Sequence, residues 1–315
     1  MDAPDAERQI RAIAACPTDL SPGDTAARAF QKIGKACLEQ IIANAELLRT
    51  RDSMRALHQT RVGLRRLRAA LILFRPLAQD ADLEAISVET RWLAQALDTA
   101  RDLDIFIRDT FYVAHAACPD QDACARLGAR LLAARADAYA KVRRTVRSHR
   151  FRTLMSGTEA WLDAGAWVHG GQVVTLRQPS ATHFAAMQLD RLRARVLKTG
   201  RHMASLDAED LHKLRIRAKK LRYAAEFFTP LFGGRHAGRQ RRLLSSVTDI
   251  QDYLGQLNDI TVAEQMAFDL VWGQPLDIAI AARQIIAERQ GEIRPSVKAA
   301  KKAFDRLKAA GRFWR

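Results

Sequence analysis

Apolar residues recur along most of the chain at the three- and four-residue spacing that places them on one side of an α-helix. Leu64, Leu67, Leu71 and Phe74, for example, fall within an arc of about 80° on a helical wheel. Long two-residue alternations of the kind that mark half-buried strands are absent from the sequence. Ala, Leu and Arg, which favour helices, dominate instead. The pattern predicts an all-α fold class.

The same spacing sets the bounds of the predicted helices. In the first part of the chain we expect helices near 24–49, 53–75, 81–115, 119–147 and 149–163. In the second part we expect them near 180–201, 207–229, 238–271, 275–291 and 295–310. Asp52, Ser53 and Asp207 stand where N-caps are needed, and Pro76 and Pro230 stand where helices end.

A segment with little helical pattern separates the two sets of helices. It spans 165–180 and contains three glycines and a proline, which are typical of a linker. We therefore divide the chain into an N-terminal tail (1–21), a first helical bundle (22–164), the linker (165–180) and a second helical bundle (181–315). A chain of 315 residues is long enough for two bundles of about 150 residues each.

The two sets of helices carry the same sequence pattern. Residues 57–77 and 211–231 share nine identities in 21 positions at an offset of 154, without a gap. The identical pairs include His58 with His212, Arg61 with Arg215, Arg68 with Arg222, Phe74 with Phe228, and Pro76 with Pro230. The match continues upstream with Phe30 and Phe184, and downstream, at an offset of 157, with Asp102 and Asp259. Ordered matches in three places indicate two pseudo-symmetric repeats.

Each copy of the repeated helix carries a basic stripe beside its apolar stripe. At about 100° per residue, the stripe consists of His58, Arg61, Arg65 and Arg68 in the first copy and of His212, Arg215, Lys219 and Arg222 in the second. Arg66 and Lys220 lie off the stripe, at its rim. Like charges three and four residues apart repel one another, so folding alone does not favour this pattern. A solvated helix face is the alternative to a binding site. If the copies pack about a pseudo-twofold axis, the stripes line one central basic pore or cleft.

A second repeated motif contains paired aspartates. Arg101-Asp102 in the first copy corresponds to Asn258-Asp259 in the second. The two aspartates are predicted to orient the basic side chains through charge-assisted hydrogen bonds, and helix caps or metal ligands are the alternatives. Asp104 has no carboxylate counterpart in the second copy, which argues against a symmetric metal site.

The charge of the chain predicts an anionic partner. Lys and Arg number 51 against 35 Asp and Glu, which gives a net charge of +16. Nucleic acid, acidic lipid headgroups and polyphosphate all fit this charge. The four cysteines have no metal-site spacing, the N-terminus is acidic rather than basic, and no apolar run is long enough to span a membrane. We therefore expect a cytoplasmic protein without a membrane span.

The repeated stretches resemble the two signature helices of the CHAD family, the conserved-histidine α-helical domain. The resemblance rests on His58-x-x-Arg61 with Arg65-Arg66-Leu67-Arg68, and on His212-x-x-Arg215 with Lys219-Lys220-Leu221-Arg222-Tyr223. Segments 97–104 and 254–259 resemble the motif that follows these helices in the family. One departure is Asp98, because the family pattern prefers the glycine found at Gly255.

The resemblance implies two similar four-helix bundles around a basic pore or cleft. It also implies binding of inorganic polyphosphate and association with polyphosphate granules. The residues predicted to contact polyphosphate are His58, Arg61, Arg65, Arg66, Arg68, His212, Arg215, Lys219, Lys220 and Arg222, with Arg101, Asp102, Tyr223 and Asp259 in supporting positions. No cofactor or metal is expected. Protonation of the histidines should tighten binding as the pH falls through about 6.5.

Two other functions are weaker hypotheses. Nonspecific nucleic-acid binding is the second hypothesis. It ranks below polyphosphate binding because single-strand binders stack bases on exposed aromatic residues, and aromatic residues make up only 7% of this chain. Phe74, Phe228 and Trp92 are predicted to lie in the core. Weak binding to nucleic acid is still expected from charge alone. A phosphohydrolase is third, because neither a phosphate-binding glycine loop nor a zinc-protease motif occurs.

Overall fold

In a computed structural model, which describes residues 12–169, 179–290 and 293–315, the chain is helical almost throughout. The first half contains α1 (Ala26–Thr50), α2 (Met54–Phe74), α3 (Ala81–Phe106), α5 (Gln121–Arg147), α6 (His149–Ala164) and the short α7 (Ala166–His169). The second half contains α9 (Ala181–Thr199), α10 (Ala208–Phe228), α11 (Ala237–Val271), α12 (Leu276–Gln290) and α13 (Ile293–Ala309). Within the described ranges there is no strand, and Thr25 and Ser180 form an isolated bridge. The predicted all-α class is confirmed.

The helix predicted over 81–115 departs from a regular α-helix at its end. α3 ends at Phe106 and continues as a π-helical turn, η1 (Ile107–Phe111), then as α4 (Tyr112–Ala114) and a 3-10 turn, η2 (His115–Ala117). The widened turn seats Phe111 against Gly128 of α5, where a Cβ atom would lie only 2.7 Å from the ring. The sequence pattern gives the length of this element, and its contact with α5 gives its irregular end.

Side-chain caps fix the starts of the repeated helices. The Ser53 hydroxyl accepts a hydrogen bond from the Ala56 backbone N–H at the start of α2. The Asp207 carboxylate accepts one from the Asp210 N–H at the start of α10. Ser53 and Asp207 are thus confirmed as N-caps, and they satisfy backbone donors that have no partner inside the helix.

The predicted linker and tail are described only in part. Residues 170–178 of the linker and 1–11 of the tail lie outside the described residues. Among the described linker residues, Trp167 of α7 is buried and Ser180 caps α9. Ile13 of the tail exchanges two backbone hydrogen bonds with the buried Asn44 amide of α1. Both segments therefore contact the helical body where they are described.

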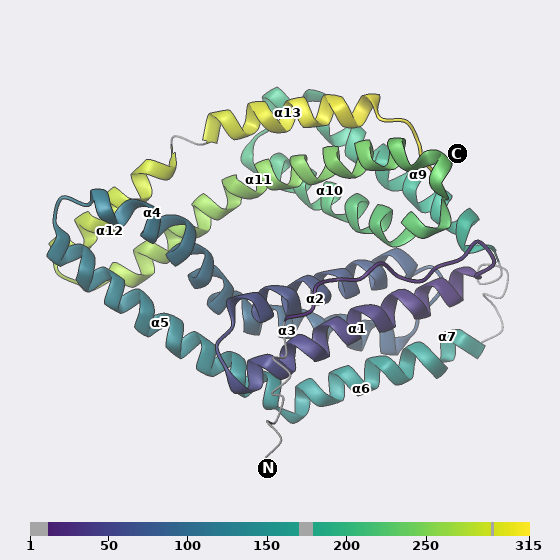
Figure 1. The fold of residues 1–315 in the computed structure, drawn as a ribbon, viewed down its shortest axis with the longest axis horizontal. Helices are drawn as coiled ribbons and strands as arrows, with labels where there is room; N and C mark the ends of the chain where they lie inside the picture. Colours follow the sequence, from purple (N-terminus) through teal and green to yellow (C-terminus); the bar gives the residue numbers. More distant parts are fainter. Residues whose placement is uncertain (1–11, 170–178, 291–292) are drawn as a thin grey trace, which may run out of the picture.

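The helices form two groups that meet along their repeated elements (Figure 1). α1, α2, α3 and α6 pack together, as do α9, α10, α11 and α13. The groups meet where α1 contacts α9 and where α2 contacts α10, while α5 and α12 pack against each other at one end of the molecule. In the described residues, no helix combines the length and apolar character needed to cross a bilayer.

Phenylalanines from both copies of the repeat pack together between the two groups. Phe74 stacks on Phe30 with ring centroids 4.8 Å apart and on Phe184 with centroids 4.9 Å apart. Phe228 meets Phe74 edge-on at 5.9 Å. Phe30, Phe74 and Phe228 are fully buried and Phe184 almost so. This aromatic cluster joins α1 and α2 to α9 and α10 through the large apolar area that each ring buries.

Because Phe74 stands at the centre of this cluster, its removal should destabilise the whole protein. Phe74→Ala is expected to lower the free energy of unfolding by about 3–5 kcal/mol, measured by urea denaturation with circular dichroism. Ile72→Ala, on the exposed side of the same helix, is the matched control and should change it by less than about 1 kcal/mol. Equal effects of the two substitutions would contradict a central role for the aromatic cluster.

Candidate polyanion-binding site

The packing of α2 against α10 brings basic side chains of both helices together. Arg61 and Arg65 come from α2, and Arg215, Lys219 and Arg222 come from α10. We call these five residues the cationic cluster. Burial, together with the charges of the four arginines, lowers the pKa of Lys219 to about 8. Five residues predicted from two segments far apart in the sequence are therefore close enough to repel one another.

Several polar atoms of this region are buried without a hydrogen-bond partner. Within the described part of the chain, they include the Nε atoms of Arg65, Arg215 and Arg222 and the hydroxyl of Tyr223. The Arg222 Nε lies 3.3 Å from Glu226 Oε1 as an ion pair, without the alignment of a hydrogen bond. A buried donor without a partner costs about 1–3 kcal/mol. An oxyanion that entered the cluster would supply the missing acceptors.

His58 lies at the edge of the cluster. Burial lowers its pKa to about 4, and the charges of Arg101, Arg65, Arg108 and Arg61 add to the effect. The imidazole of the free protein is therefore neutral at pH 6.5. Burial and the surrounding arginines thus place the protonation of His58 in the free protein below the pH of about 6.5 expected for an isolated histidine, and tighter binding on protonation stays a prediction.

Arg108 was not among the predicted residues. It stands in the π-helical turn η1, where its side chain pairs with Asp109 and its charge reaches His58. The regular helix expected over 81–115 gave no reason to single it out. Arg101, predicted as a supporting residue, is brought to the same histidine, and burial followed by the charge of Arg108 lowers its pKa.

The remaining predicted binding residues have other surroundings. His212 is exposed on α10, and Lys220 is half-buried. Burial lowers the pKa of Arg68, with a further contribution from Arg91 that Asp98 opposes. A binding role for these three side chains remains a prediction.

Arg66 is engaged within the protein itself. Its Nη1 donates to Glu226 Oε2 at 3.2 Å, and its guanidinium stacks 4.9 Å from the centre of the Phe227 ring. It also lies beside Cys37, whose pKa burial raises to about 11 against the opposing effect of Arg66. Only 8% of Arg66 is exposed, and its contacts with Glu226 and Phe227 link α2 to α10, so we infer that it stabilises the packing of these two helices. Contact with a ligand is a prediction for this residue as well.

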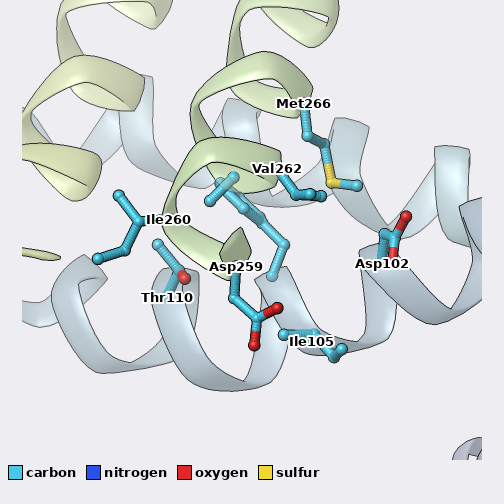
Figure 2. A pocket seen from close by; sticks show the side chains of 9 residues that line it. Asp102, Ile105, Thr110, Asp259, Ile260, Val262 and Met266 are labelled. Carbon is cyan, nitrogen blue, oxygen red and sulfur yellow. The ribbon is translucent and has the colours of Figure 1, made fainter. Parts of the chain in front are cut away.

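The two repeated aspartates line one small cavity between α3 and α11 (Figure 2). Asp102 comes from α3 and Asp259 from α11, and Ile105, Thr110 and Met266 are among the other lining residues. The cavity has a volume of about 40 Å³, which is room for little more than water. The structure thus brings together the repeated aspartates of the two halves, and it places them close to the repeated basic stripes.

The carboxyl group of Asp102 is perturbed by this enclosure. Burial, together with the charges of Asp98 and Asp259, raises its pKa to about 6 against the opposing charges of Arg61 and Arg101. Its charge therefore reaches the cationic cluster, as the sequence suggested. A hydrogen bond from Asp102 to a basic side chain of the stripe stays a prediction.

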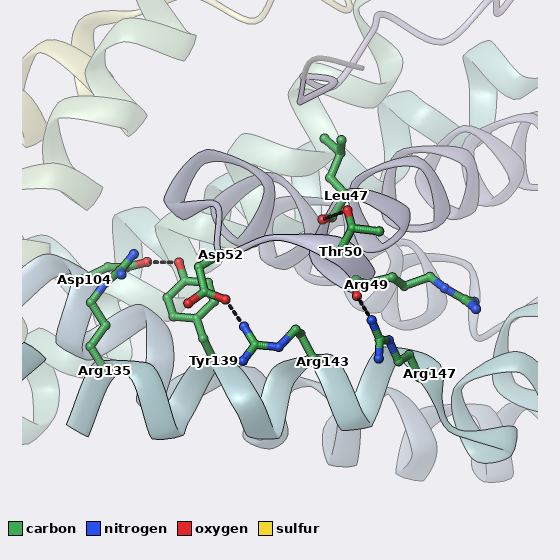
Figure 3. A network of polar contacts seen from close by, with 9 residues as sticks. All are labelled: Leu47, Arg49, Thr50, Asp52, Asp104, Arg135, Tyr139, Arg143 and Arg147. Carbon is green, nitrogen blue, oxygen red and sulfur yellow. Dashed lines mark hydrogen bonds and ion pairs between the residues drawn. The ribbon is translucent and has the colours of Figure 1, made fainter. Parts of the chain in front are cut away.

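Asp104 performs a structural task in the first half (Figure 3). Its fully buried carboxylate accepts hydrogen bonds from Arg135 Nε and from the Tyr139 hydroxyl, both at 2.7 Å. Both partners belong to α5, so the contact ties α3 to α5. Nearby, Arg143 of α5 pairs with Asp52, which is therefore a partner for α5 while Ser53 caps α2.

Comparison with known proteins identifies the family. The model of the CHAD domain matches residues 32–267. The chain belongs to the CHAD family. It is similar to the crystal structure of the CHAD domain from the plant Ricinus communis, with a TM-score of 0.80 and 28% sequence identity over 94% of this chain and 96% of that one. The resemblance predicted from the two signature helices is confirmed.

A second solved structure shares the fold at lower identity. PptA from Streptomyces chartreusis matches with a TM-score of 0.63 and 16% identity, over 92% of this chain and 100% of that one. No curated protein matches the sequence. The CHAD fold of this chain is thus supported by both a plant and a bacterial structure.

Because enclosure raises the pKa of Asp102, its ionisation should oppose folding. The folded-state pKa of about 6 exceeds the ordinary value of 3.8, so the folded protein binds more protons between these values. Stability should therefore decline as the pH rises from about 4 to 6. Asp102→Asn is expected to raise the free energy of unfolding by about 1–3 kcal/mol at pH 7, and by little at pH 4.

Urea denaturation at the two pH values measures this difference. Asp82→Asn, an exposed carboxylate in the first turn of the same helix, serves as the control and should give no comparable gain at pH 7. A loss of stability in Asp102→Asn at pH 7 would instead mean that the ionised carboxylate is needed to hold the neighbouring arginines.

Proposed function

We propose that this CHAD protein binds inorganic polyphosphate without catalysing its turnover, and that it associates with polyphosphate granules. The observation that carries the proposal is the cationic cluster, in which five basic side chains from α2 and α10 repel one another. Burying such charges without an anion opposes folding. A ligand with closely spaced negative charges would remove the repulsion. The family resemblance of the signature helices points to the same ligand.

The chemistry of the side chains suits a bare phosphate chain. Arginine forms paired hydrogen bonds with phosphate oxygens, and lysine adds a compact charge. The aromatic residue closest in sequence to the cluster, Tyr223, is 2% exposed and offers no face for a base to stack on. Exposed Phe268 lies on α11, about 20 Å along the helix from Gly255, which Arg215 faces, and exposed Trp272 follows the last residue of α11. These features favour polyphosphate over nucleic acid as the ligand.

We also propose that the two halves are related by a pseudo-twofold axis and that the cluster lines a central basic cleft. Three pairs of equivalent residues support this relation, because members of each pair come together across the two halves. Phe74 meets Phe228, and Asp102 and Asp259 line one cavity. The charges of Arg61 and Arg215 both lower the pKa of Lys219. Such an arrangement would present two copies of the basic stripe to one polyphosphate chain.

The predicted core aromatics bear on the nucleic-acid alternative. Phe74 and Phe228 are fully buried, as predicted. Trp92 is partly buried and packs against the core, and the Arg150 guanidinium covers its ring at 4.0 Å. A long cationic side chain can cover the part of a tryptophan ring that core packing leaves exposed.

Competition between long-chain polyphosphate and duplex DNA tests the choice of ligand. At matched phosphate and about physiological salt, polyphosphate should displace labelled DNA at least tenfold more effectively than the reverse, a difference of about 1.4 kcal/mol. Equal competition would make nucleic acid as good a partner as polyphosphate. The chain length of the polyphosphate should stay unchanged when it is incubated with protein and Mg²⁺, and its shortening would contradict the non-catalytic role.

A quadruple variant tests the location of the site. Replacing Arg61, Arg65, Arg215 and Lys219 by Ala should lower the affinity for polyphosphate at least about a hundredfold, with helicity retained, because each charge-assisted bond lost from Arg65, Arg215 and Lys219 costs at least about 1 kcal/mol. The charge-matched control replaces four exposed cations, Lys141, Arg144, Lys298 and Lys302. If both variants lose affinity equally, the overall charge rather than the cluster binds the ligand.

Binding should also take up protons near pH 8. The pKa of Lys219 is lowered to about 8 in the free protein, so about half of these side chains are neutral at that pH. A bound polyanion favours the charged form and raises the pKa again. Titration calorimetry at pH 8 should therefore give binding enthalpies that vary with the ionisation enthalpy of the buffer, and affinity should fall as the pH rises from 7 to 9.

Lys219→Arg is the matched variant, because arginine keeps its charge throughout this range. It should bind polyphosphate with most of the dependence on buffer and pH removed. A wild-type protein whose binding enthalpy is the same in all buffers at pH 8 would show that Lys219 does not face the bound anion.

A further inference from the structure

The two halves differ at one position that faces the repeated arginine. In the first half, Arg61 Nη1 donates to the Asp98 carboxylate of α3 and lies 3.5 Å from the Ala94 carbonyl oxygen. In the second half, Arg215 lies over Gly255 of α11, where a Cβ atom would be 3.8 Å from its Nε and Nη2 atoms. The repeated arginine therefore pairs with an aspartate carboxylate in the first half and faces a glycine, which has no side chain, in the second half.

The correspondence follows from the repeat itself. Arg61 and Arg215 are equivalent at the offset of 154, and Asp98 and Gly255 at the offset of 157 that holds for the following helix. Both pairs join a signature helix to the helix after it, α2 to α3 and α10 to α11. The charge of Asp98 is also felt by Arg68 and Asp102, so it lies within the site and not on a distant surface.

Arg215, the equivalent arginine of the second half, interacts less strongly with nearby carboxylates than Arg61 does. Asp252 lies close enough to Arg215 and Arg222 for their charges to lower its pKa, although burial and Asp249 outweigh them and raise it. The Nε of Arg215 nevertheless remains buried without a hydrogen-bond partner among the described residues. Arg215 is therefore ready to receive an anion, whereas Arg61 already holds one.

We propose that Asp98 is an internal counter-ion that masks Arg61 and sets the affinity of the site, an inference that rests on the proposed binding of polyphosphate. The anion engages Arg215, Lys219 and Arg222 first. Arg61 joins only when a phosphate displaces the Asp98 carboxylate. This exchange is accessible because 45% of the Asp98 side chain is exposed, and an ion pair that is open to water is weak. Asp98 thus makes the two halves of the site unequal.

Replacement of Asp98 by asparagine removes the charge and keeps the shape. Asp98→Asn should bind long-chain polyphosphate about threefold to tenfold more tightly than the wild type, measured by fluorescence titration at constant salt. Asp82→Asn makes the same change in net charge about 24 Å away along α3 and should alter the affinity by less than about twofold. Unchanged or weaker binding by Asp98→Asn would overturn the proposal.

The reciprocal change gives the second half its own counter-ion. Gly255→Asp places a carboxylate beside Arg215 and should weaken binding by a similar factor. Gly255→Ala is the control for the added side chain, because a Cβ atom there makes only an ordinary contact at 3.8 Å. If Gly255→Ala weakens binding as much as Gly255→Asp, space rather than charge decides the effect, and the proposal fails.

A double-mutant cycle identifies Arg61 as the residue that Asp98 masks. Arg61→Ala should cost less than about threefold in affinity in the wild type and at least about tenfold in Asp98→Asn. Equal costs in the two backgrounds would overturn the proposal. Wild-type protein that fails to bind polyphosphate at all would refute the proposed function, and the role of Asp98 with it. Wild-type binding without the gain in Asp98→Asn would refute only the inference about Asp98.

Discussion

The contact between α2 and α10 is the constraint on which the rest of this structure depends. Each of the two helices has an apolar face with a basic stripe beside it. When the helices pack through their apolar faces, their basic stripes also come close together. Burial of aromatic rings such as Phe74 and Phe228 supplies the attraction, because each ring removes a large apolar area from water. The cationic cluster is held together by this burial against its own repulsion.

The structure limits that repulsion with fixed carboxylates rather than by separating the charges. Glu226 lies between Arg66 and Arg222, and Asp98 lies against Arg61. These acids neutralise part of the charge, yet burial and the charges of Arg61, Arg215 and Arg222 still lower the pKa values of Arg65 and Lys219. If the cluster binds an anion as proposed, it is preorganised for that ligand, because the cost of gathering the cations is met during folding and not during binding.

Contacts away from the cluster keep the helices in place. Asp104 ties α3 to α5 through Arg135 and Tyr139, and Trp161 of α6 donates to Asp80 at the start of α3. Most of the stability of helices in proteins comes from tertiary packing, so such contacts both stabilise the helices and fix their relative positions. Rigidity in α3 matters directly for the site, since Asp98 and Asp102 both project from it.

The sequence by itself determined the helices, the repeat, the family and five side chains that come together, because spacing along a helix fixes which residues share a face. The tertiary structure decided the rest. It gave Arg66 a structural partner, lowered the pKa of His58 and brought Arg108 into range through the π-helical turn. It also paired Asp98 with Arg61, a contact between neighbouring helices that no periodicity within one helix can reveal. Distances between helices depend on the packing of side chains in three dimensions, and that packing sets both the partners and the ionisation of buried groups.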